Sequence, residues 1–156
     1  MSTNIKDAVS TLNSLIETCK DGENGFKKAA EEAKEPSLKT LFAKYSAQRT
    51  GYARELQQAV TSLGETPSES GHVAAALHRG WMTLKESLSK HEDTAIIDEA
   101  EAGEDAAIKA YQEASAKTLP APVLELIRRQ FAGIQEAHGT IRDLKHSRHR
   151  TSAATL

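Results

Sequence analysis

Apolar residues recur along the chain in alternating steps of three and four, the spacing of one face of an α-helix. The same spacing appears in four long stretches and in one shorter stretch. It predicts long helices at about residues 4–34, 37–63, 93–117 and 121–147, with a shorter crossover helix at about 70–89. The positions that carry the first helix are Ile5, Val9, Leu12, Ile16, Cys19, Phe26, Ala30 and Ala33.

Proline residues mark the breaks between the long helices. Pro36 in "KEPS" and Pro120 in "TLPAP" interrupt the helical pattern, because proline lacks a backbone N–H and restricts the residue before it. Each break is short enough for an antiparallel helix hairpin. We therefore expect an all-α protein, a four-helix bundle in which the crossover joins two hairpins. Residues 1–147 would form one domain, and residues 148–156 a flexible tail.

Length, charge and cysteine usage narrow the class of protein. A chain of 156 residues is long enough for one domain with a buried core, and a formal net charge of −2 gives no reason to expect nucleic acid or an anionic membrane as a partner. No apolar stretch could span a bilayer, and the start "MSTNIKDAVS" lacks the layout of a signal peptide. The single cysteine, Cys19, fits a reducing compartment. We expect a soluble, cytoplasmic protein.

A polar layer interrupts the apolar pattern near the middle of the helices. Continuing the apolar spacing of the first and third long helices leads to Glu23 and Glu104. Residues equally distant from a hairpin turn lie at equal height, which places Glu23 opposite Gln48 and Glu104 opposite Gln135. His138 follows Gln135 by about one helical turn. We predict that Glu23, Gln48, Glu104, Gln135 and His138 form a buried polar layer.

Each buried carboxylate needs a partner, because an isolated one costs several kcal/mol or becomes protonated. The sequence leaves three arrangements open: a bound metal ion, protons shared with the amides, or a pocket that holds water. A hydrogen-bonded layer could also set the register between otherwise interchangeable apolar layers.

This layer resembles the di-metal site of the ferritin-like superfamily, in which two helices each supply a Glu and two others each supply a Glu-x-x-His motif. Here the second helix carries Gln48-x-x-Gly51 and the fourth carries Gln135-x-x-His138. Both motif carboxylates are therefore amides, and one histidine is a glycine. The resemblance implies a ferritin-like bundle in which Glu23, Glu104 and His138 are the remaining good ligands for iron or manganese.

Three segments of the chain also resemble a bacterial family of four-helix-bundle proteins in that superfamily, known mainly as a domain of unknown function. The segments are "LIETCKDGENGF", "ALHRGW" and "GEDAAIKAY", and the resemblance covers about residues 8–146. It implies the fold and leaves the activity open.

Our leading hypothesis is a non-catalytic bundle protein without a cofactor, in which a degenerate di-metal site is kept as a structural layer. No phosphate-binding loop, nucleophile elbow or catalytic triad spacing is present in the sequence. The partner would be a second copy or another protein, and the superfamily resemblance implies a link to stress physiology. The alternative is a di-iron or dimanganese carboxylate protein, an oxidoreductase or a metal store. Its ligands would be Glu23, Glu104 and His138, with Gln48 and Gln135 completing the shell.

Overall fold

The computed structural model describes residues 3–68 and 92–155, and within them it has four α-helices and no strand. The helices are α1 (Thr3–Glu32), α2 (Pro36–Ser62), α4 (Asp93–Ser115) and α5 (Ala121–Thr155). The predicted all-α class is confirmed, and the first three of these helices begin and end within two residues of the predicted positions. The predicted crossover helix at about 70–89 lies outside the described residues.

Proline and glycine define the two ends of α2. Glu35 has extended backbone angles, φ −71° and ψ 128°, and Pro36 starts the helix where its missing N–H has no role. At the other end, Gly64 has a positive φ of 84°, the left-handed conformation that glycine adopts without steric cost. The N–H of Glu65 then donates to the carbonyl of Val60 at 3.3 Å, which satisfies a helix-end acceptor.

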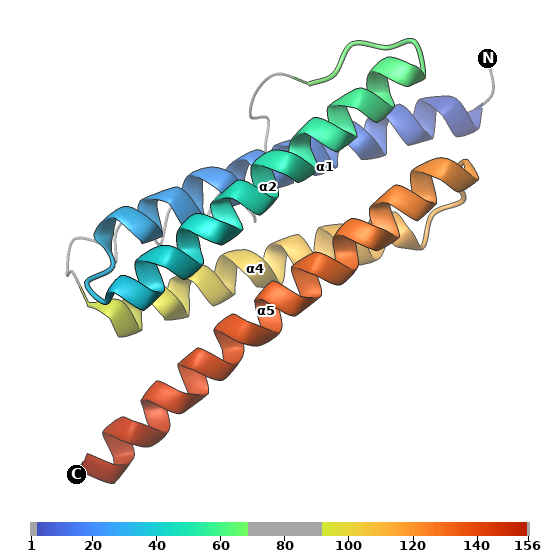
Figure 1. The fold of residues 1–156 in the computed structure, drawn as a ribbon. Helices are drawn as coiled ribbons and strands as arrows, with labels where there is room; N and C mark the ends of the chain where they lie inside the picture. Colours follow the sequence, from blue (N-terminus) through green and yellow to red (C-terminus); the bar gives the residue numbers. More distant parts are fainter. Residues whose placement is uncertain (1–2, 69–91, 156) are drawn as a thin grey trace.

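The four helices form two antiparallel hairpins that pack as a bundle (Figure 1). Helix α1 packs along α2, and α4 packs along α5. The hairpins meet mainly where α1 runs against α4, whereas α2 and α5 approach each other over a short stretch. The remaining pairs, α1 with α5 and α2 with α4, therefore lie on the diagonals of the bundle.

The turn between α1 and α2 is fastened to the start of α4. The backbone N–H groups of Lys34 and Glu35 donate to the two carboxylate oxygens of Asp93, at 2.8 and 3.1 Å. Asp93 lies in the first turn of α4, where a negative charge also complements the helix dipole. One side chain thus holds one end of the first hairpin against the second hairpin.

A polar layer divides the apolar core into two halves near the middle of the bundle. Arg49 on α2 and Glu104 on α4 are buried between the two halves, with 1% and 0% of their surface exposed. Glu104 is thus one of the buried residues of α4. The buried apolar residues that flank the layer along the chain are Cys19, Ala53, Ala107 and Ile134 in one half, and Phe26, Tyr45, Ala100 and Ala137 in the other.

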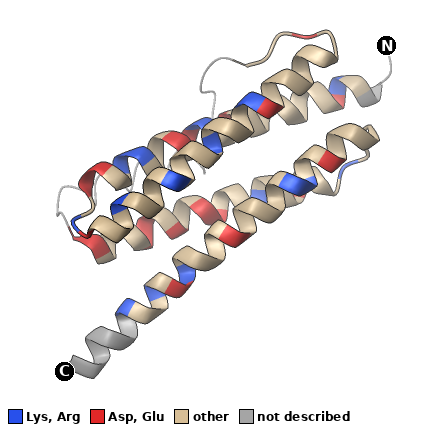
Figure 2. Ribbon diagram, viewed as in Figure 1, with Lys and Arg blue, Asp and Glu red and all other residues tan. Residues whose placement is uncertain are grey.

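Helix α5 is longer than the sequence pattern predicts. It continues to Thr155, beyond the predicted helix end at residue 147. Two basic residues before this end pair with acidic groups of other segments: Lys145 contacts Glu101 of α4 at 3.0 Å, and Arg148 contacts Glu35 in the α1–α2 turn at 2.5 Å. Figure 2 shows basic and acidic residues interspersed along the described helices. The basic stretch is thus partly neutralised by acidic groups of α4 and of the α1–α2 turn.

Candidate functional site

The central feature of the bundle is a buried ion pair between Arg49 and Glu104. Nη1 of Arg49 lies 2.6 Å from Oε1 of Glu104, and Nη2 lies 2.6 Å from Oε2. These are two parallel charge-assisted hydrogen bonds, the fork geometry that guanidinium and carboxylate groups favour. Because α2 and α4 belong to different hairpins, this pair crosses the diagonal of the bundle and connects the two hairpins.

Three further residues surround the guanidinium of Arg49. Its Nε donates to Oε1 of Gln48 at 3.1 Å. Its central carbon lies 5.2 Å from the centre of the Phe26 ring, within the range of a cation–π contact. A Cβ placed on Gly22 would lie 3.2 Å from Nη1 and 3.3 Å from Cγ of Arg49. Glycine at this position therefore makes room for the arginine.

The charge on Arg49 is maintained by its partner. Burial disfavours the charged guanidinium, but the attraction of Glu104 outweighs this effect and raises the pKa of Arg49. A buried charge that loses its partner is strongly destabilising, whereas an apolar pair of similar volume can be tolerated. The pair is therefore a weak source of net stability, although losing one partner alone is costly.

Glu23 lies at the predicted height but has different partners. Oε2 of Glu23 accepts a hydrogen bond from Thr50 at 2.6 Å, and its backbone carbonyl accepts one from Ser46 at 2.9 Å. Gln48 lies between these two positions in the sequence and hydrogen-bonds to Arg49 instead. Both Glu23 and Gln48 are half-buried. They belong to the edge of the layer.

Gln135 is exposed, so its predicted place in the buried layer is wrong. It follows the buried Ile134 by one residue, about 100° around the helix, and therefore points away from the core. Gln130, on the same helix, is fully buried. His138 is half-buried, and its Nε2 lies 2.6 Å from Oδ1 of Asp105 on α4.

The donors present do not fit the di-metal site that the superfamily resemblance implies. Both carboxylate oxygens of Glu104 are held by Arg49, which already supplies a positive charge in the layer. Glu23 is bonded to Thr50, and His138 to Asp105. Within residues 3–68 and 92–155, no group of three or more His, Cys, Asp and Glu side chains is arranged to hold a metal ion.

Arg49 is the residue that the sequence reading missed. The buried positions of α2 are Leu38, Phe42, Tyr45, Arg49, Ala53, Leu56 and Val60, in steps of three and four. The signal was therefore present, because a step of four from Tyr45 leads to Arg49. Arg49 is not part of the apolar pattern, and charged side chains are rarely fully buried without a partner.

A second polar network begins beside the ion pair and runs toward the surface. The hydroxyl of Tyr111 donates to Oε1 of Gln130 at 2.7 Å and lies 3.1 Å from Sγ of Cys19. A phenol has one hydrogen, and Tyr111 uses it for Gln130, so the thiol of Cys19 is the donor in the second contact. Burial raises the pKa of Cys19 to about 11 and raises that of Tyr111 well above its usual range. Both groups are therefore neutral at physiological pH.

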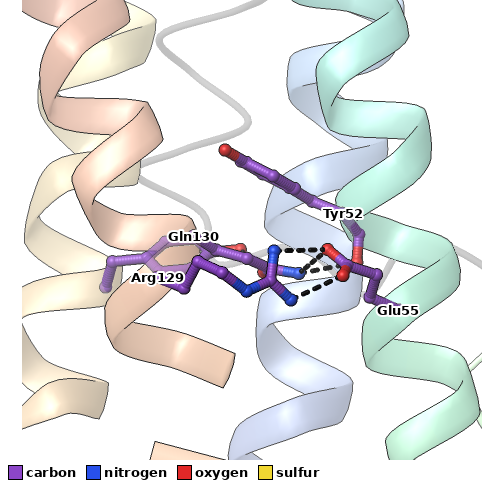
Figure 3. Close-up of polar contacts among 5 residues, drawn as sticks. Tyr52, Glu55, Arg129 and Gln130 are labelled. Carbon is purple, nitrogen blue, oxygen red and sulfur yellow. Dashed lines mark hydrogen bonds and ion pairs between the residues drawn. The ribbon is translucent and has the colours of Figure 1, made fainter. Parts of the chain in front are cut away.

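The network ends between α2 and α5 (Figure 3). Nε2 of Gln130 donates to the backbone carbonyl of Tyr52 at 3.2 Å and to Oε1 of Glu55 at 3.1 Å. The other oxygen of Glu55 accepts from Nη2 of Arg129 at 2.5 Å. The hydrogen bond from Arg129 lowers the pKa of Glu55. Because Glu55 and Arg129 are partly exposed, solvent screens this outer pair.

Comparison with known proteins identifies a family. The model of a family described as "Domain of unknown function (DUF2383)" matches residues 7–117. No curated protein matches the chain. Separately, each helix in the described part of the chain is too polar or too short to cross a lipid bilayer.

Proposed function

The chain belongs to the DUF2383 family, and we propose that it is a non-catalytic, ferritin-like bundle protein whose central polar layer is structural. On this proposal the layer descends from the plan of a di-metal site, with glutamates near mid-height on the first and third long helices. The protein would act through its outer surface, by assembly with itself or with another protein.

One observation supports this proposal above the others: Arg49 binds both oxygens of the buried carboxylate of Glu104. A general acid or base must reach the proton that it transfers, and a metal ligand must offer a lone pair to the metal. Glu104 is 0% exposed, and each of its oxygens accepts a hydrogen bond of 2.6 Å. The guanidinium at both oxygens repels a metal cation, and burial keeps a substrate away, so in this arrangement the carboxylate suits neither role.

The neighbouring polar groups support the same conclusion. Cys19 and Tyr111 are buried and hydrogen-bonded, and burial raises the pKa of both groups. A nucleophilic cysteine needs the opposite environment, one that is partly exposed and that lowers its pKa. The groove of about 360 Å³ between α1 and α4 is lined by neither Arg49 nor Glu104.

The alternative, a di-iron or dimanganese protein, requires that Arg49 release Glu104. It also requires Glu23 and His138, which hydrogen-bond to Thr50 and Asp105, to meet Glu104 around one metal centre, and the described residues show no such group. Metal analysis separates the two proposals. The protein is expressed in medium supplemented with iron and manganese, then loaded with iron under anaerobic conditions. We expect far less than one metal ion per chain, whereas about two per chain would establish the alternative.

The assembly part of the proposal has its own test. Size-exclusion chromatography with light scattering measures the mass of the particle directly. A dimer or a larger ring supports assembly with itself. A monomer at all concentrations removes self-assembly from the proposal and leaves a different protein as the partner.

A further inference from the structure

We propose that the central layer is a cradle for a guanidinium group, with Arg49 as its resident ligand, and that it selects this planar cation over a divalent metal ion. The inference deepens the proposed function and rests on it in one respect, that the layer is structural. It adds the chemical class of the ligand that the layer recognises. The members of the cradle are Glu104, Gln48, Phe26 and Gly22.

The hydrogen-bond acceptors of the cradle match the donors of a guanidinium. The two oxygens of Glu104 receive Nη1 and Nη2, each at 2.6 Å, and Oε1 of Gln48 receives Nε at 3.1 Å. The group is thus bound at all three of its nitrogens. Such a set of acceptors is complementary to the fixed fork geometry of guanidinium, which a spherical cation does not have.

The shape of the cradle also matches a flat cation. The Phe26 ring lies 5.2 Å from the guanidinium carbon, so an aromatic surface covers the cation where a metal ion would need a ligand atom. On α1, Gly22 leaves a gap that is filled by Nη1 and Cγ of Arg49. An aromatic ring and a glycine are suited to a flat organic cation, and neither can coordinate a metal.

A divalent metal ion would find too few ligands in the same place. Iron and manganese sites of this kind need several carboxylates and imidazoles. Of the groups bonded to the guanidinium, only Glu104 is anionic, and Gln48 is a neutral amide. The thiol of Cys19 is a poor ligand because burial keeps it protonated.

The position of the cradle gives it a structural task. Arg49 belongs to the first hairpin and Glu104 to the second, across a diagonal where the backbones of α2 and α4 scarcely meet. A long side chain bound at its tip therefore sets the spacing and the relative height of the hairpins. In the ferritin-like plan a metal centre makes this connection between helices. Here a covalently attached cation makes it.

Chemical rescue tests the proposal. Arg49→Ala empties the cradle and leaves its other members in place. We expect a melting temperature lower by about 6 to 20 °C, the range for a broken buried ion pair in a chain of this size. Guanidinium chloride at low millimolar concentration, far below its denaturing range, should recover part of this loss and bind once per chain by calorimetry. Manganese chloride at the same concentration should recover none.

The matched control is Arg54→Ala, the same change at an exposed position of α2. This variant and the wild type should not be stabilised by guanidinium. Recovery of Arg49→Ala by manganese, absence of recovery by guanidinium, or equal stabilisation of Arg54→Ala would each overturn the cradle. The metal content of the wild type is measured alongside. If the wild type is metal-free and guanidinium does not rescue Arg49→Ala, the cradle alone is overturned. If the wild type contains metal, the proposed function is overturned.

If Arg49→Ala does not fold, the variant Arg49→Lys tests the proposal instead. Lysine keeps the positive charge but presents a single ammonium in place of three nitrogens in one plane. A guanidinium cradle predicts that Arg49→Lys melts clearly below the wild type. If Arg49→Lys matches the wild type, the layer accepts any cation and the proposal is wrong.

Discussion

Gly133 offers a sharp test of the packing between α2 and α5. A Cβ added at Gly133 would lie 1.9 Å from the hydroxyl oxygen of Tyr52 and 3.2 Å from its Cζ. At Gly139, on the same helix, a Cβ would have no neighbour within 4 Å. Both glycines are half-buried and lie inside α5. The pair of substitutions Gly133→Ala and Gly139→Ala therefore isolates the contact with Tyr52.

The expected magnitudes follow from two effects of opposite sign. Replacing a helical glycine by alanine stabilises by about 1 kcal/mol at either site. At Gly133 the new methyl must displace the Tyr52 ring, and overpacking of this kind costs about 1–3 kcal/mol. Because the gain in helix propensity is the same at both sites, Gly133→Ala should be less stable than Gly139→Ala by about 1–3 kcal/mol. In a chain of this size this corresponds to about 2 to 12 °C in melting temperature.

The assay is urea unfolding followed by circular dichroism, with both variants and the wild type measured together. A third variant locates the cause. Tyr52→Phe in the Gly133→Ala background removes the clashing oxygen and should recover much of the difference. If Gly133→Ala and Gly139→Ala have equal stability, or if the double variant recovers nothing, the close approach of Tyr52 to α5 is wrong.

Three further predictions concern the buried and exposed polar groups. Glu104→Ala leaves Arg49 charged and unpaired, and urea unfolding should show a loss of about 3–5 kcal/mol; Arg49→Met with Glu104→Leu should lose much less, and an equal loss would contradict the ion-pair account. Arg129→Ala breaks the exposed pair with Glu55 and should cost less than about 1 kcal/mol in the same assay, so a loss as large as that of Glu104→Ala would contradict its description as screened. Burial raises the pKa of Cys19 from 9.0 to about 11. The contribution of the buried thiol to the free energy of unfolding is therefore complete below pH 9 and is lost as the pH rises to about 11. Wild-type stability should therefore fall more steeply than that of Cys19→Ala in this window, by about 2–3 kcal/mol in total, and parallel curves would show that the thiol is not buried.

Local chemistry was sufficient to predict where the described helices lie, apart from the end of α5. The spacing of apolar residues placed all four described helices, because burying one face of a helix requires that spacing whatever the helix packs against. Pro36 and Gly64 act through their own backbone geometry, so the ends of α2 follow from the sequence as well. The end of α5 does not follow from the sequence, because no proline or glycine marks it and the apolar pattern weakens before Thr155.

Part of the polar layer also followed from the sequence. Glu104 falls on the apolar spacing of its helix, and it is buried where that spacing places it. Counting from the first hairpin turn put Glu23 at the right height, because the α1–α2 turn is tight and its two helices run side by side. The same counting failed for Gln135, since it gives the height of a residue and says nothing about the direction in which its side chain points.

The partner of Glu104 was decided by the tertiary structure alone. A turn relates residues within one hairpin, but Arg49 and Glu104 lie in different hairpins and meet across the diagonal. Their contact depends on how the two hairpins pack, and that packing is the sum of many weak contacts over the length of α1 and α4. The same packing decides which face of α5 is buried, and with it the choice of Gln130 over Gln135. The sequence alone therefore specified the helices and the height of the layer, while the packing of one hairpin on the other determined that the cation beside Glu104 is an arginine.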